Sequence, residues 1–151
     1  MRTILVFLLS GIFLAASAQN QPVGIFSMSS DIGNPKVKGS AAYNPADQSY
    51  TLKGGGYNIW FERDEFFYLF NKMKGDFMLT ANVAFVGKGT NAHRKVGLML
   101  RETTADKSAH STATLHGDGL TVLQWRRTYG APMRDPQDEL FADSSWYNVL
   151  Q

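Results

Sequence analysis

The chain has 151 residues, of which 15 are Lys or Arg and 13 are Asp or Glu, and it contains no cysteine. The net charge of +2 is small and its basic residues are dispersed, so the sequence lacks the sustained positive field that nucleic acid or an anionic membrane surface requires. The missing cysteines exclude a disulfide framework and a lipid-modified N-terminal cysteine.

The first 18 residues have the three parts of a secretory signal peptide. Arg2 supplies the positive charge, the segment 4–14 is apolar apart from Ser10 and Gly11, and the small residues 16–18 form a cleavage site before Gln19. A transmembrane anchor would need about 20 apolar residues, and this run is shorter. We therefore expect one domain over residues 19–151 that is periplasmic or extracellular, without stable membrane insertion after cleavage.

The first half of that domain alternates short strand patterns with turn residues. Ala41–Tyr43 and Tyr50–Lys53 flank the turn-forming segment 44–48, which predicts a hairpin. Three glycines at 54–56 precede a strand predicted over Tyr57–Phe61. The aromatic run within Asp64–Met73 fits either a buried strand or a short helix, and we favour a strand because aromatic residues dominate it.

Alternation becomes regular after Gly75. It predicts strands over Phe77–Phe85, Lys95–Arg101, Ser111–Leu115 and Leu120–Arg127, the last two joined by a glycine-containing turn at 116–119. Each strand has an apolar side expected to face the core and a more polar side expected to be open. No segment of convincing length reads as an amphipathic helix. The pattern predicts an all-β, antiparallel sandwich or jelly roll.

Several motifs in this order resemble a known family of secreted domains. They are the segments 54–60 (GGGYNIW), 64–66 (DEF), 72–77 (KMKGDF), 93–97 (HRKVG) and 116–120 (HGDGL). The region from about Gly24 to Arg127 resembles a concanavalin A-like lectin/glucanase (LamG-like) domain. It is similar in particular to the domain that precedes a TolB-like β-propeller in bacterial cell-envelope proteins, often described as biopolymer-transport proteins.

This resemblance implies a two-sheet jelly roll whose concave face binds carbohydrate in relatives. Relatives continue through further strands into a propeller, whereas this chain stops at Gln151, inside what reads as the start of a strand. The resemblance therefore implies a fragment that lacks C-terminal strands. Phe67 and Phe70 stand where similar sequences tend to carry other ring types, which weakens transfer of function through that segment.

A glucanase of this fold places three carboxylates at alternate positions of one strand. Glu62 and Asp64 fit the first two positions, but Phe66 occupies the third, and Glu65 would point to the opposite face. The catalytic set is incomplete, and the segment reads more simply as an acidic turn. We expect no enzyme activity.

Other chemistry is equally unsupported. The sequence lacks a nucleophile elbow, a zinc-binding HExxH helix and a phosphate-binding glycine loop, and His93, His110 and His116 are scattered. Asp118 could contribute to a Ca²⁺ site, although it is more simply a turn former. We predict no cofactor, with Ca²⁺ the one weak candidate.

The remaining role is binding. Sugar rings stack on aromatic side chains, and their hydroxyl groups pair with amides and guanidinium groups. The predicted polar faces offer such residues, namely Asn58, Trp60, Thr80, Asn82, Arg101, His116, Gln124 and Arg126. Trp60 could instead be a core residue and the others the solvated side of a sheet.

Three functions follow in order of preference. The first is a non-catalytic, secreted module that binds carbohydrate or a glycoconjugate. The second is a cell-envelope module that binds protein, normally its own propeller or a neighbouring envelope component. The third is a divergent glycoside hydrolase.

Overall fold

The computed structural model describes residues 21–151, so the predicted signal peptide lies outside the described residues. Strands are the only regular elements of that range, and none of its segments is a helix long and apolar enough to cross a membrane. Every strand pair is antiparallel. The strands are β1 (Met28–Ile32), β2 (Ser40–Asn44), β3 (Ser49–Lys53), β4 (Ile59–Trp60), β5 (Arg63–Asp64), β6 (Phe66–Phe70), β7 (Ala81–Asn82), β8 (Lys95–Arg101), β9 (His110–His116), β10 (Thr121–Arg126), β11 (Glu139–Phe141) and β12 (Val149–Leu150).

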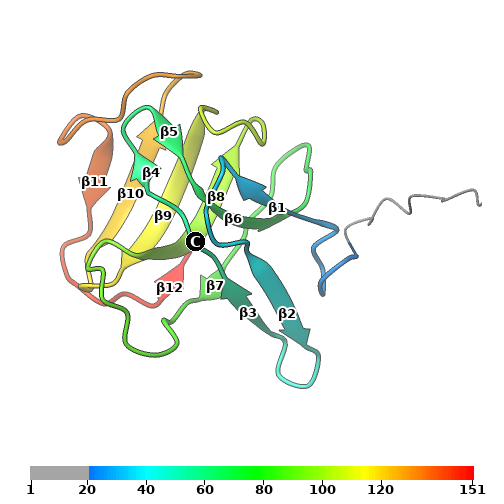
Figure 1. Cartoon of the computed structure of the whole chain (residues 1–151). Helices are drawn as coiled ribbons and strands as arrows, with labels where there is room; N and C mark the ends of the chain where they lie inside the picture. The colour runs from blue at the N-terminus through cyan, green and yellow to red at the C-terminus, as the bar shows by residue number, and fades with distance from the viewer. Residues whose placement is uncertain (1–20) are drawn as a thin grey trace, which may run out of the picture.

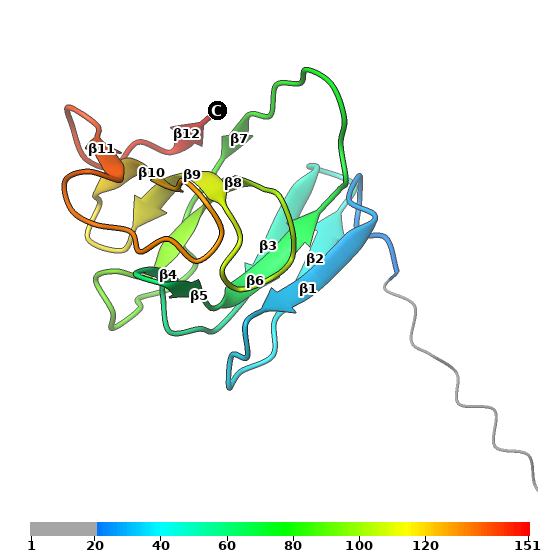
Figure 2. The same cartoon turned by 90° about the horizontal axis from the view of Figure 1, so that it is seen from above.

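A four-stranded sheet in the order β11-β10-β9-β8 forms the largest unit (Figure 1). Four two-stranded sheets surround it and pair β1 with β6, β2 with β3, β4 with β5, and β7 with β12. Figure 2 shows β4 and β5 on one side of the four-stranded sheet and β7 and β12 on the other. The all-β, antiparallel class predicted from the sequence is confirmed.

Several predicted elements are confirmed closely. The hairpin appears as β2 and β3, the aromatic run appears as β6, and the strand over Lys95–Arg101 has the predicted bounds. The hairpin of β9 and β10 turns at residues 117–120, where the backbone N–H of Leu120 bonds to the Asp118 carboxylate. The sequence was sufficient to predict these elements because, in each, the alternation of apolar and polar residues and the turn-forming residues indicate the same structure.

Two predicted strands are shorter in the structure. The segment predicted over Phe77–Phe85 is a strand only at Ala81–Asn82, where Val149 and Leu150 pair with it. The one predicted over Tyr57–Phe61 keeps only Ile59–Trp60, because Phe61 has a φ of 57° and begins a tight turn. Strand patterning in the sequence is not enough where the chain turns or finds no partner strand.

The two faces of the four-stranded sheet reverse the expected burial. Thr112, Gln124 and Arg126 point to the polar face and are each at most 2% exposed, because β4 and β5 lie over that face. On the apolar face, by contrast, Leu100, Leu123 and Leu140 are 54%, 41% and 62% exposed. The prediction of an open polar face is therefore wrong, and the apolar face is buried only in part, at Leu115 and less completely at Leu98 and Trp125.

Candidate functional site

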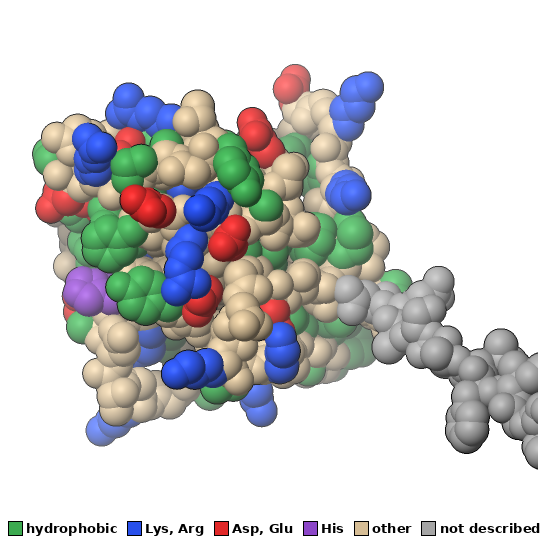
Figure 3. Space-filling view, turned by 45° about the horizontal axis from the view of Figure 1, so that its top comes forward, with side chains coloured by type: hydrophobic (Ala, Val, Ile, Leu, Met, Phe, Trp, Pro, Cys, Tyr) green, Lys and Arg blue, Asp and Glu red, His purple; other side chains and the backbone are tan. Residues whose placement is uncertain are grey.

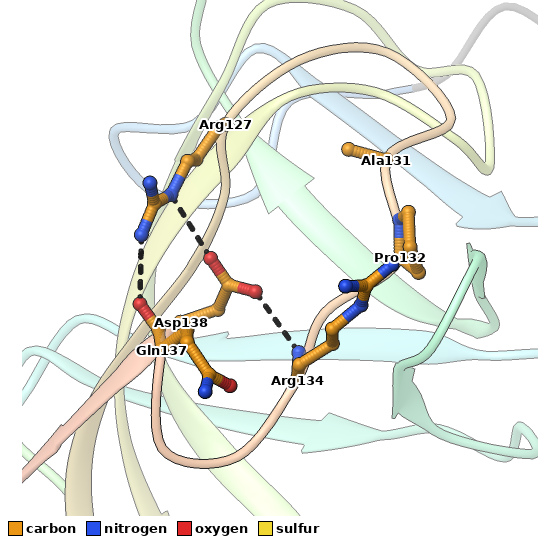
Figure 4. A pocket seen from close by; sticks show the side chains of 6 residues that line it. All are labelled: Arg127, Ala131, Pro132, Arg134, Gln137 and Asp138. Atoms are coloured by element: carbon orange, nitrogen blue, oxygen red, sulfur yellow. Dashed lines mark hydrogen bonds and ion pairs between the residues drawn. The ribbon is translucent and has the colours of Figure 1, made fainter.

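The loop between β10 and β11 lines a shallow hollow of about 300 Å³ that is open to solvent. We call it the loop cavity, and Figure 4 shows the side chains that line it: Arg127, Ala131, Pro132, Arg134, Gln137 and Asp138. Four of these side chains are charged or carry an amide, and two are apolar. Such a lining combines hydrogen-bonding groups with a small apolar surface, as ligand sites commonly do.

The Asp138 carboxylate is the fixed centre of the loop cavity. Its Oδ1 accepts a hydrogen bond from Arg127 Nε at 3.0 Å, and its Oδ2 accepts one from the backbone N–H of Arg134 at 3.0 Å. The Asp138 side chain is 10% exposed, whereas the Arg127 side chain is 65% exposed. Each carboxylate oxygen retains acceptor capacity because it can take more than one hydrogen bond.

The second arginine of the loop cavity differs from the first. Figure 4 shows the guanidinium group of Arg134 beside Pro132, on the other side of Asp138 from Arg127. Among residues 21–151 the Arg134 guanidinium has no hydrogen-bond or ion-pair partner, and Arg134 is exposed. Two cationic side chains and one carboxylate give the lining an excess of one positive charge.

Hydrogen bonds to the end of β10, to the β4–β5 turn and to the loop between β8 and β9 hold this loop in place. The carbonyl of Ala131 accepts from Arg126 Nε at 3.1 Å, and the N–H of Met133 donates to the carbonyl of Phe61 at 2.9 Å. The N–H of Gly130 donates to the carbonyl of Lys107 at 2.8 Å. A loop anchored in this way loses less conformational freedom when it binds a ligand.

The anchor at Arg126 belongs to a buried group of four side chains that we call the Asp64 cluster: Asp64, Arg101, His110 and Arg126. Arg126 Nη1 and Nη2 each donate to one oxygen of Asp64 at 2.8 Å, and Arg101 Nη1 donates to Oδ2 at 3.3 Å. None of the four side chains is more than 2% exposed. A buried carboxylate is stable only with such partners, so the cluster fixes β5 onto the sheet.

His110 completes the Asp64 cluster without carrying a charge at neutral pH. Burial, opposed in part by Asp64, lowers the pKa of His110 to about 4. Its Nδ1 lies 2.9 Å from the hydroxyl of Thr112, and its Nε2 lies 3.7 Å from Asp64 Oδ2. A second hollow, of about 350 Å³, lies beside this cluster, but the two guanidinium groups at its base are closed from solvent.

The far end of the same polar face holds His116 and Lys95. Lys95 Nζ donates to the side-chain oxygen of Asn58 at 2.7 Å, which ties the segment before β4 to β8. Both ring nitrogens of His116 are buried and lack a hydrogen-bond partner within residues 21–151. Burial, followed by the charge of Lys95, lowers the pKa of His116 to about 4.

The predicted binding residues do not share one surface in the structure. Five of them lie on or against the polar face beneath β4 and β5: Asn58, Arg101, His116, Gln124 and Arg126. Trp60 is half-buried in β4 and pairs with Arg63. Thr80 and Asn82 lie elsewhere, Thr80 exposed just before β7 and Asn82 in β7 opposite Val149. The strongly buried members, Gln124, Arg126 and His116, lie in the interior and leave no open surface between them.

The two carboxylates that fit the glucanase pattern, Glu62 and Asp64, lie in different environments in the structure. Asp64 is fully buried and paired with Arg126, whereas Glu62 is exposed in the β4–β5 turn. Glu65 accepts hydrogen bonds from Arg63 and from the backbone of Tyr57. Within residues 21–151, no group of three His, Cys, Asp or Glu side chains lies close enough to hold a metal ion.

The face drawn in Figure 3 has no large patch of positive or of negative charge, because Lys and Arg side chains are interspersed there with Asp and Glu. Asp118, the weak Ca²⁺ candidate, is exposed, and its carboxylate accepts from Leu120 N–H, which lowers its pKa. These observations describe a turn former at Asp118 and a mixed surface around it.

Comparisons with protein-family models, with curated proteins and with solved structures found no match for this chain.

Sequence reasoning did not identify the loop cavity. Its residues lie in a segment without alternation, where Gly130, Pro132 and Pro136 interrupt any regular pattern. One available signal was the density of Arg, Asp and Gln between those residues, since conformationally fixed loops often carry binding groups.

Proposed function

We propose that this protein is a non-catalytic binding module, secreted to the periplasm or the cell exterior, whose ligand is a carbohydrate or glycoconjugate held in the loop cavity. The observation that carries the proposal is the open cavity around Asp138, with two guanidinium groups, an amide and an apolar surface within it. The concanavalin A-like resemblance of the sequence supports the same class of ligand.

The chemistry of the lining suits a sugar ring. Hydroxyl groups can donate to the remaining lone pairs of Asp138 and accept from the side-chain amide of Gln137. The apolar C–H groups of the ring can contact Ala131 and Pro132. Because Asp138 is already oriented by Arg127 and by the backbone of Arg134, binding needs little rearrangement of the acceptor.

The finer fold that we propose is a two-sheet jelly roll of concanavalin A type. The apolar face of the β8–β11 sheet supports it, because a sheet with one apolar face normally packs that face against a second sheet. In this structure β7 and β12 lie on that side.

A glycan array tests the proposal, probed with residues 19–151 and with the variant Gln137→Ala. The backbone carbonyl of residue 137 still accepts from Arg127 in this variant, so the fold is preserved while one side-chain amide is lost. We expect glycan binding that weakens at least several-fold in Gln137→Ala and is unchanged in Gln21→Ala, a matched change at an exposed distant site. A folded protein that binds none of the glycans would contradict the proposal.

The exposed apolar face supports a second candidate function, a cell-envelope module that binds protein. Leu123 pairs directly with Leu140 across β10 and β11, and both side chains are exposed. Leu100 extends the apolar surface onto β8. The strand positions on this face carry no Lys, Arg, Asp or Glu, so the matching partner is an uncharged, apolar protein surface.

Photo-cross-linking in cells tests this second function. A photoreactive amino acid at position 100 should give a discrete protein adduct, and the same amino acid at the exposed position 51 of β3 should not. The substitution Leu140→Lys should remove the adduct, because it places a charge within the apolar surface. If position 100 gives no adduct, or if both positions give the same adduct, the result would contradict a protein partner on this face.

A further inference from the structure

We infer that the loop cavity selects anionic saccharides, those that carry a carboxylate or a sulfate group, over their neutral counterparts. This inference rests on the proposed carbohydrate-binding function and adds the charge of the ligand to it. Its structural basis is the guanidinium group of Arg134, which lies at the wall of the cavity. Among residues 21–151 this group has no acidic partner.

The two arginines of the loop cavity have different tasks. Arg127 donates through Nε to Asp138 and through Nη2 to the carbonyl of Gln137, so its guanidinium group is committed to holding the loop. Arg134 contributes only its backbone N–H to Asp138, and its guanidinium group is free. The fixed carboxylate is thus neutralised by Arg127, while the charge of Arg134 remains unneutralised in the cavity.

The neighbouring acids do not neutralise Arg134. Asp135 follows it in the chain but does not line the cavity, and its charge acts on Glu139 of β11, whose pKa is raised mainly by burial and then by Asp135. Asp138 accepts from Arg134 through the backbone, not through the guanidinium group. The lining therefore keeps its excess positive charge.

An arginine in this position recognises anionic groups well. Its planar guanidinium group offers parallel N–H donors to the two oxygens of a carboxylate or to two oxygens of a sulfate. Asp138 can meanwhile accept from the hydroxyl groups of the same sugar, and Pro132, beside Arg134, can contact its ring. An anionic saccharide uses all of these groups at once, whereas a neutral one leaves Arg134 without a partner.

The carboxylate of Asp138 also argues against a simple inorganic anion. Free sulfate has no hydrogen-bond donor at neutral pH, and inorganic phosphate carries its one or two hydroxyl groups on an ion that the nearby Asp138 carboxylate repels. A sugar supplies donors and an anionic group on one ring. The predicted ligand is therefore a saccharide with both.

The test compares matched pairs of sugars by isothermal titration calorimetry at two salt concentrations. Each pair consists of an acidic saccharide (a galacturonate oligomer, a sialyl oligosaccharide or a sulfated galactan oligomer) and its methyl ester or unsulfated form. We expect at least one acidic member to bind about tenfold or more tightly than its neutral partner, since one charge-assisted contact has about that value. Added salt should reduce this preference.

Arg134→Gln is the decisive variant, and Arg134→Lys is its control. Both keep the backbone N–H that Asp138 accepts, and Arg134 is exposed, so both should fold. Arg134→Gln should abolish the preference for acidic sugars while neutral sugars still bind, and Arg134→Lys should retain part of it. Phosphate and free sulfate should not compete at concentrations where the sugar binds.

The outcomes separate the two proposals. Equal binding within every pair, or a preference unchanged in Arg134→Gln, would overturn the inference and leave the carbohydrate-binding function standing. Failure of all acidic and neutral sugars to bind would overturn both. Competition by phosphate as effective as that of the sugar would reduce the loop cavity to an anion site and overturn the inference.

Discussion

Removing the Arg126 side chain should cost the protein a large part of its stability. Arg126→Met takes both short hydrogen bonds from Asp64, which is fully buried, and leaves it only the longer contact with Arg101. Breaking a buried pair from one side costs about 3–5 kcal/mol. The free energy of unfolding of a domain is about 5–15 kcal/mol, so the variant should lose a large part of it.

The double variant Asp64→Asn, Arg126→Met isolates the reason. It removes the Asp64 carboxylate as well, so the buried guanidinium group of Arg101 is left without a counter-charge. We expect it to be less stable than Arg126→Met alone by about 2 kcal/mol. Urea unfolding followed by tryptophan fluorescence measures all three proteins. A cost below about 1 kcal/mol for the single variant, or a double variant at least as stable as it, would refute the view that Asp64 and the two buried arginines depend on one another.

Three further changes test other parts of the structure. Because His110 and His116 have pKa values of about 4 in the folded state against 6.5 when unfolded, unfolding takes up protons between these values. The free energy of unfolding should then fall as pH drops from about 6.5 to 4, by up to about 1.4 kcal/mol per pH unit for each histidine, and His116→Gln should clearly reduce that slope in urea titrations; an unchanged slope would contradict it. Gly97→Ala should cost about 1–3 kcal/mol in the same assay, because its Cβ would lie 2.1 Å from the backbone oxygen of Ala113, and a neutral effect would show that this approach is looser than described. Leu140→Ser should change stability by less than about 0.5 kcal/mol yet reduce the binding of a hydrophobic dye, and a larger loss of stability would mean that Leu140 is buried in solution.

Local signals in the sequence predicted the strands that carry the candidate site, but not the contacts between them. The bounds of β8, β9 and β10 could be predicted because regular alternation and the turn after His116 specify them within a few residues. Asp64 pairs with Arg126, which lies 62 positions further along the chain. The alternation of apolar and polar residues within a strand cannot predict a contact between such distant residues.

That distant pairing also explains the reversed burial. The polar face of the sheet is buried because β5 brings a carboxylate to two arginines, and the segment before β4 brings an amide oxygen to Lys95. Alternation shows which residues share a face but not which segment will cover it. The loop cavity was missed for a related reason, since its residues are positioned by bonds to Lys107, Phe61 and Arg126 and not by any repeat in the loop itself.

The most direct test of the binding account is a chemical-shift map of ¹⁵N-labelled protein titrated with a sugar that binds on the array. The account predicts that the largest amide shifts fall within residues 127–138, with small changes at the buried residues Gln124 and His116. Shifts centred on β4 and the polar face would contradict the loop cavity as the site, and shifts absent from both regions at saturating sugar would contradict carbohydrate binding itself.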